Sequence, residues 1–177
     1  MRTILTARFW LAFALVVVGV VLRVMPHPWN FAPIGAIALF GGARFERRTL
    51  AVGIPLLTMF VGDAFIGFHS LMPVIYATYA LIAVIGMLLR DRTSVAAIGG
   101  GSLVASTIFY LTTNFAVWAN GTTYAKTAAG LAACYIAAIP FFGNTIASDA
   151  IYTAIFFGTF ALMERYDPHH FAASERH

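Results

Sequence analysis

Long apolar runs separated by short polar loops occupy nearly the whole chain. Most of these runs approach the roughly 20 residues that a helix needs to cross the hydrocarbon core of a bilayer. Charged residues make up 10% of the sequence, against about 25% in a soluble domain, and the mean hydropathy is +0.84. The sequence therefore predicts an all-α integral membrane protein. We expect a polytopic transmembrane helical bundle that forms one domain over residues 1–177.

The apolar runs predict six membrane spans and one extra short apolar segment. The spans are expected at about residues 9–25, 31–45, 49–68, 71–89, 94–118 and 145–163. The extra segment, residues 124–142, contains Pro140 and is followed by a predicted break at Gly143-Asn144. It can be re-entrant, which leaves six crossings, or a seventh span, which moves the C-terminus to the outer side. Pro140, the small Ala and Gly positions and Lys126 favour the re-entrant form.

Arginines in the loops predict the orientation in the membrane. Arg2 and Arg8 precede the first segment. Arg44, Arg47 and Arg48 lie between the second and third segments, and Arg90 and Arg92 lie between the fourth and fifth. The loops at residues 26–30 and 69–73 contain neither Lys nor Arg. Cytoplasmic loops are enriched in Lys and Arg. We therefore expect a bacterial inner-membrane protein whose N-terminus is cytoplasmic.

The second segment, within residues 29–48, differs from the others because it is short and rich in small residues. Its apolar part covers about 20 Å at 1.5 Å per residue, less than the hydrocarbon core. Ala32 and Ala36, like Ala38 and Gly42, stand four residues apart, so that one face would allow another helix to approach closely. The segment is either a docking surface or a helix that packs tightly inside the bundle.

Seven polar or amphipathic residues are expected to lie at a similar depth near the outer side and to line one cavity. They are Asn30, Asp63, His69, Asn114, Trp118, Asn144 and Asp149. An aspartate in a membrane span costs about 2.5–3.5 kcal/mol on insertion scales, so it usually faces a partner or water. Asp63 can pair with Arg23, bind a polar or cationic ligand, or take part in proton coupling.

Most familiar catalytic and cofactor motifs are missing. No His-Glu-x-x-His, Gly-x-Ser-x-Gly or dinucleotide-binding glycine pattern occurs, and Cys134 is the one cysteine. We expect neither an enzyme nor a bound cofactor, metal or nucleic acid. A polar tail that contains His169, His170 and His177 is expected to be disordered.

Several motifs together resemble a family of uncharacterised bacterial membrane proteins. They are Pro-His-Pro-Trp-Asn-Phe-Ala-Pro-Ile-Gly-Ala-Ile-Ala-Leu-Phe-Gly-Gly at residues 26–42, Asp63 with Gly67, Thr113-Asn114-Phe115, and Pro140-Phe-Phe-Gly-Asn144. The size, the early Ala/Gly-rich helix and the polar cluster are also similar to the substrate-binding (S) components of energy-coupling-factor transporters. That resemblance implies a six-helix protein that binds a small solute from outside and docks on a separate ATPase module. The first segment lacks the Ala-x-x-x-Ala pattern with which those proteins dock. Ala32 and Ala36, in the second segment, have the same spacing and would take its place.

These patterns predict a membrane protein that binds and imports a small polar solute from the outer side. The alternatives are a proton- or cation-coupled transporter or channel, and a structural membrane protein whose polar residues only hold helices together. The identity of the solute, the existence of an ATPase partner and the oligomeric state do not follow from the sequence.

Overall fold

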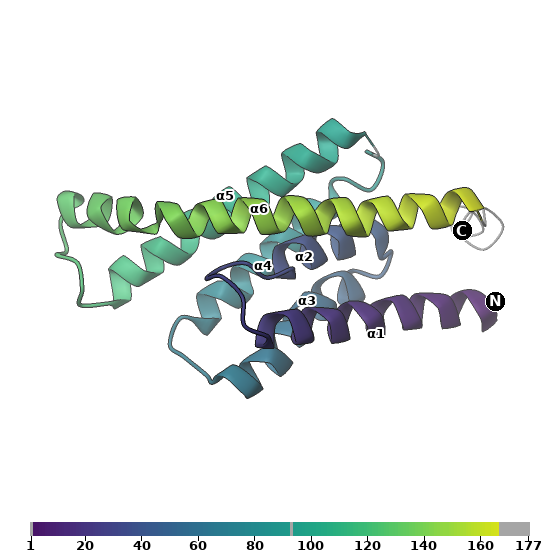
Figure 1. Cartoon of the computed structure of the whole chain (residues 1–177), viewed down its shortest axis with the longest axis horizontal. Helices are drawn as coiled ribbons and strands as arrows, with labels where there is room; N and C mark the ends of the chain where they lie inside the picture. The colour runs from purple at the N-terminus through teal and green to yellow at the C-terminus, as the bar shows by residue number, and fades with distance from the viewer. Residues whose placement is uncertain (1, 93, 167–177) are drawn as a thin grey trace.

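A computed structural model describes residues 2–92 and 94–166 of the chain, and the histidine-containing tail lies outside these residues. The described residues form six helices and no strand (Figure 1). The helices are α1 (Arg2–Val24), α2 (Ile34–Arg44), α3 (Arg48–Ile66), α4 (Met72–Met87), α5 (Val95–Asn120) and α6 (Ala128–Tyr166). The all-α prediction is confirmed, and the helix ends lie close to the expected ones except in α1 and α6.

The predicted break at Gly143-Asn144 is wrong. Helix α6 runs for 39 residues without interruption and includes Pro140. The apolar run at residues 124–142 is therefore neither a re-entrant segment nor a separate seventh span, because its helical part and the last predicted span are one helix. Proline removes one backbone donor, and a helix packed among other helices can tolerate this loss.

Three helices are long and apolar enough to cross a membrane: α3, α5 and α6. The other three apolar helical stretches, Trp10–Val24, α2 and α4, are shorter. The 11 residues of α2 rise about 16 Å, roughly half the hydrocarbon thickness, so α2 does not cross a bilayer by itself. A helical bundle with membrane-spanning helices is supported, whereas six full crossings do not follow from the helix lengths.

Successive helices run in opposite directions along the long axis of the molecule (Figure 1). The start of α1 and the end of α6 lie at the same end of the molecule. The α2–α3 and α4–α5 connections, which carry the loop arginines, also lie toward that end, here called the arginine-rich end. The α1–α2, α3–α4 and α5–α6 connections lie toward the other end. The α5–α6 hairpin extends beyond the remaining helices there (Figure 1).

The short helix α2 forms the centre of the hydrophobic core. Every residue from Ile34 to Ala43 is buried, and α2 contacts each of the other five helices. Its Phe40 packs edge-on against two aromatic rings of α6, with centroid distances of 5.2 Å to Phe157 and 5.6 Å to Phe160. A helix that is apolar on all sides must be buried, and here the other helices surround it.

The small residues of α2 pack inside the bundle, and Gly42 packs against α4. A Cβ atom on Gly42 would overlap the carbonyl oxygen of Ala83 and lie 2.9 Å from the Cα of Gly86. Ala36 and Ala38 are also buried, and Ala32 is half-buried. The predicted close helix approach therefore takes place within the bundle, which leaves Ala36, Ala38 and Gly42 no surface for a separate protein.

Candidate functional site

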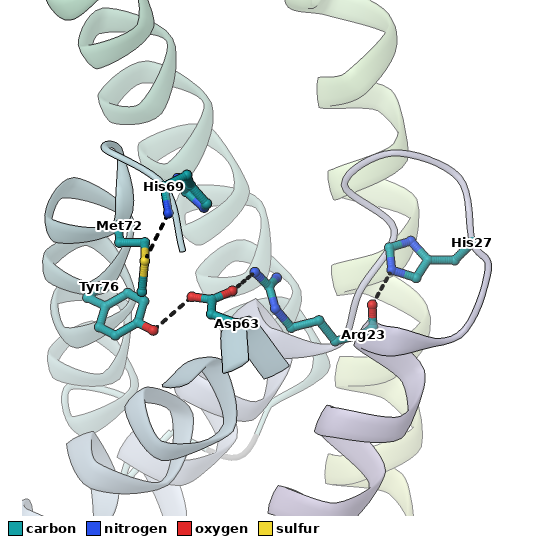
Figure 2. Close-up of polar contacts among 6 residues, drawn as sticks. All are labelled: Arg23, His27, Asp63, His69, Met72 and Tyr76. Carbon is teal, nitrogen blue, oxygen red and sulfur yellow. Dashed lines mark hydrogen bonds and ion pairs between the residues drawn. The ribbon is translucent and has the colours of Figure 1, made fainter. Parts of the chain in front are cut away.

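An ion pair inside the bundle joins α1 to α3. Nη2 of Arg23 donates a hydrogen bond to Oδ1 of Asp63 at 2.5 Å, and the hydroxyl of Tyr76 in α4 donates to Oδ2 at 2.7 Å. Figure 2 shows the carboxylate between these two partners. Asp63 is 1% exposed and the side chain of Arg23 is 18% exposed. Charge-assisted hydrogen bonds of this kind are the strong ones, so the cluster of Arg23, Asp63 and Tyr76 ties three helices together.

Two glycines explain why this cluster forms where α3 ends. Gly67 has φ of 110°, a conformation that favours glycine, and its amide donates to the carbonyl of Asp63 at 2.7 Å. Asp63 is thus held in the last turn of α3. Gly62 leaves room for the Arg23 side chain, because a Cβ there would lie 2.7 Å from its Cδ.

Arg23 keeps unused donor capacity. Its Nε is buried and has no hydrogen-bond partner among the described residues. The backbone carbonyl of Arg23 lies 3.0 Å from Nε2 of His27, so the imidazole caps the end of α1 beside the cluster (Figure 2). A guanidinium offers five donors, and a further acceptor near Arg23 would therefore find a donor without breaking the ion pair.

Asp149, in the middle of α6, lies at the N-terminus of α2. Its Oδ2 accepts a hydrogen bond from Oγ of Ser106 at 2.6 Å, and it also accepts one from the backbone amide of Ala36. A Cβ on Gly35 would overlap the carboxylate, so glycine is needed for this close approach. A negative group at a helix N-terminus is favoured by the helix dipole and pairs an otherwise free amide. Pro33, the N-cap residue of α2, makes no side-chain cap, and Asp149 provides the cap from another helix.

Two further side chains of α6 bind the segment that precedes α2. Nδ2 of Asn144 donates to the carbonyl of Trp29 at 3.0 Å, and Oγ of Ser148 donates to the carbonyl of Ala32 at 2.9 Å. This segment turns at Asn30, which has φ of 61°, a conformation that asparagine tolerates better than most residues. The polar residues of α6 therefore hold the α1–α2 connection in place.

The opposite end of α2 is bound by an arginine. Arg90, which follows α4, donates from Nη2 to the carbonyl of Phe45 at 2.6 Å and from Nε to the carbonyl of Gly42 at 3.1 Å. Positive charge at a helix C-terminus is stabilising. From the sequence, Arg90 was interpreted only as an orientation signal. No local sequence pattern relates it to Gly42 and Phe45, which it contacts from more than 40 positions along the chain.

The predicted site residues do not form one cluster. Asn114 donates to the carbonyl of Tyr110 in its own helix, Trp118 donates to the carbonyl of Ala125, and the backbone amide of His69 lies 3.4 Å from Sδ of Met72. Asp63 and Asp149 have different hydrogen-bond partners, but both lie close enough to the buried Tyr79 of α4 to interact with it electrostatically. The structure thus has two acidic centres with separate partners. One is at Asp63, and the other is at Asp149, with Asn144 near the same helix start.

Sequence reasoning identified Arg23 as a possible partner of Asp63 but missed Tyr76 and Ser148. No sequence pattern sets either residue apart from the other hydroxyl groups of the chain. Within residues 2–92 and 94–166, no three His, Cys, Asp or Glu side chains gather as a metal site would require.

Replacing Asp149 by alanine is expected to lower the free energy of unfolding by about 2 kcal/mol, because the amide of Ala36 and the hydroxyl of Ser106 would lose their buried acceptor. Asp149→Asn retains one acceptor oxygen and should lose less. Thermal unfolding in detergent measures the difference. Asp91→Asn, at an exposed loop position, serves as the control. An unchanged melting temperature for Asp149→Ala would contradict the capping role.

Comparison with known proteins identifies a family for this chain. No curated protein and no solved structure is significantly similar to this sequence. The sequence pattern of one family covers residues 3–170, which is nearly the full length and includes both acidic centres. The chain therefore belongs to DUF6580, a family of unknown function.

Proposed function

We propose that this protein binds a small polar solute from the outer side of a bacterial inner membrane and supports its import, like the S component of an energy-coupling-factor transporter. In this proposal the arginine-rich end faces the cytoplasm, in keeping with the distribution of Lys and Arg in membrane proteins. Both termini of the helical bundle then lie on the cytoplasmic side. The arginine-poor end, toward which the α1–α2 and α3–α4 connections lie, faces outward (Figure 1).

The cluster of Arg23, Asp63 and Tyr76 carries this proposal. It places a positive group, a negative group and a hydroxyl together where α1 and α3 end, at the arginine-poor end. Ionisable residues within membrane segments are costly and are usually retained for a function. The partial exposure of Arg23 leaves part of its side chain within reach of a polar group of the solute.

Import would need an energy source outside this chain, because the sequence has no phosphate-binding glycine loop. A separate ATPase module is the partner expected for an S component, and the protein working alone is the other arrangement. Ala36, Ala38 and Gly42 of α2 are buried inside the bundle. A partner protein would therefore have to bind lipid-facing residues of the outer helices.

Native mass spectrometry tests solute binding. The purified protein, its Asp63→Asn variant and the Asp91→Asn control are exposed to a bacterial metabolite extract and then examined for retained small molecules. We expect one adduct on the wild type and the control that is lost from Asp63→Asn while this variant, although less stable, remains folded at the temperature of the measurement. Asparagine keeps an acceptor oxygen for Arg23, which is why the fold should survive.

Two other results would assign a different function. An adduct on all three proteins would remove Asp63 from the site. No adduct on any of them, with a large loss of stability in Asp63→Asn, would favour a structural role for the ion pair.

Ion-coupled transport is the second candidate, and Asp149 favours it. This carboxylate is 3% exposed, and no basic side chain lies within 4 Å of it in the described part of the chain. Buried carboxylates without a cationic partner serve as proton or cation sites in transporters. Flux into proteoliposomes that depends on a pH or sodium gradient and disappears in Asp149→Asn would establish this function in place of the first one.

A further inference from the structure

A second feature lies at the arginine-rich end, away from both acidic centres. Helices α1 and α6 make little contact with one another, and a groove of about 290 Å³ lies between them. Its lining is almost wholly apolar and includes Leu11, Leu15, Phe40, Phe156, Phe160 and Met163. Phe40 belongs to α2 and is 1% exposed, so the groove reaches the core of the bundle.

Arg44 stands beside this groove. It follows Phe40 by one helical turn, and its guanidinium carbon lies 4.8 Å from the ring centroid of Phe160 and 5.7 Å from that of Phe157. The side chain is 16% exposed, and its Nε is buried without a hydrogen-bond partner among the described residues. Oε1 of Glu164, whose side chain is largely exposed, lies 4.0 Å from Nη1 of Arg44. The positive charge of Arg44 therefore lies next to an apolar groove, and the carboxylate of Glu164 neutralises it only weakly.

We propose that this groove binds one acyl chain of an anionic phospholipid from the bilayer and that Arg44 binds the phosphate of the same lipid. The apolar lining suits a hydrocarbon chain rather than a polar solute. Basic pockets between membrane helices on the cytoplasmic side bind anionic headgroups. In the orientation proposed above from the loop arginines, the arginine-rich end is the cytoplasmic one.

The shape of the groove suits part of a flexible acyl chain. Its apolar walls come from α1, α2 and α6, and its volume is about 290 Å³. A flexible alkyl chain can follow its walls.

Native mass spectrometry with defined lipids tests this proposal. The full-length protein in detergent is titrated with dioleoyl phosphatidylglycerol or with dioleoyl phosphatidylcholine, which differ in headgroup charge but not in acyl chains. We expect the wild type to retain one phosphatidylglycerol more tightly than phosphatidylcholine. Arg44→Gln should lower the affinity for phosphatidylglycerol by about fivefold, the effect of one arginine near an anionic headgroup. Arg47→Gln, at an exposed position in the same connection, should leave it unchanged.

A second variant tests the groove without touching the charge. Ala14 lines the groove and is exposed, so that Ala14→Trp should fold normally while it fills the space. We expect this variant to lose the tightly bound lipid whatever its headgroup. Equal retention of both lipids by the wild type, or full lipid binding by Ala14→Trp, would overturn the proposal. A dimer without bound lipid would overturn it too and would assign the groove to contact between copies.

Discussion

Replacing Gly42 by alanine is expected to destabilise the folded protein by about 3 kcal/mol. The added methyl group would overlap the carbonyl oxygen of Ala83 and press on the Cα of Gly86, and both atoms belong to the backbone of α4. A flexible side chain could move away, but a helix backbone cannot move without loosening the central contact between α2 and α4. The same change at an unhindered helical position would favour the helix by up to about 1 kcal/mol.

Unfolding in detergent, followed by circular dichroism against temperature or denaturant, measures this effect. Gly158→Ala is the matched control, because nothing lies within 4 Å of the position that its new Cβ would occupy. We expect Gly158→Ala to melt at or slightly above the wild-type temperature, and Gly42→Ala to melt well below it. Equal melting temperatures for the two variants would show that α2 does not approach α4 as described.

Replacing Arg23 by leucine is expected to destabilise the protein by about 3–5 kcal/mol. The change leaves the carboxylate of Asp63 buried, 1% exposed, and without the positive charge of Arg23, while the hydroxyl of Tyr76 still donates to it. Removing one member of a buried ion pair costs more than removing both, because the charge that remains is not compensated. The double variant Arg23→Leu/Asp63→Leu should therefore recover most of the lost stability.

The four proteins of this double-mutant cycle are compared by denaturant unfolding, with Arg92→Leu, an exposed loop arginine, as a control for the loss of one positive charge. Additive losses from the two single changes would mean that Arg23 and Asp63 do not interact. The cycle is also informative about function. A stable double variant that no longer retains a solute would separate the binding role of the pair from its contribution to the fold.

Hydrophobic pattern alone predicted much of the architecture. Helices α2 to α5 lie close to the expected segments. An apolar run in a membrane must form a helix so that its backbone groups are hydrogen-bonded, and prolines or charged loops end it. The pattern failed at residues 143–144. Gly and Asn often end helices, but here Asn144 is held by the carbonyl of Trp29 and the helix continues. A contact between residues 115 positions apart has no signature in a local sequence window.

The candidate site, like the fold, was predicted only in part from the sequence. Asp63 and Asp149 stand out in the sequence because carboxylates are rare in apolar segments, and Arg23 is a natural partner for one of them. Their gathering with five other residues in one cavity was predicted from a common depth in the membrane. Depth says nothing of the direction in which a side chain points around its helix. Asn114 and Trp118 accordingly bond within their own hairpin, far along the chain from Asp63.

The sequence by itself determined that the chain is helical, that several segments are apolar enough for a membrane, and that the loop arginines share one end of the molecule. These properties depend on the composition of each segment and on the positions of apolar and charged residues along the chain. Only the tertiary structure decided that α2 is a buried central helix bound at its start by Asp149 and at its end by Arg90, and that Asp63 meets Tyr76. Those contacts depend on which helices become neighbours and how each is rotated, which is a property of packing among all six helices.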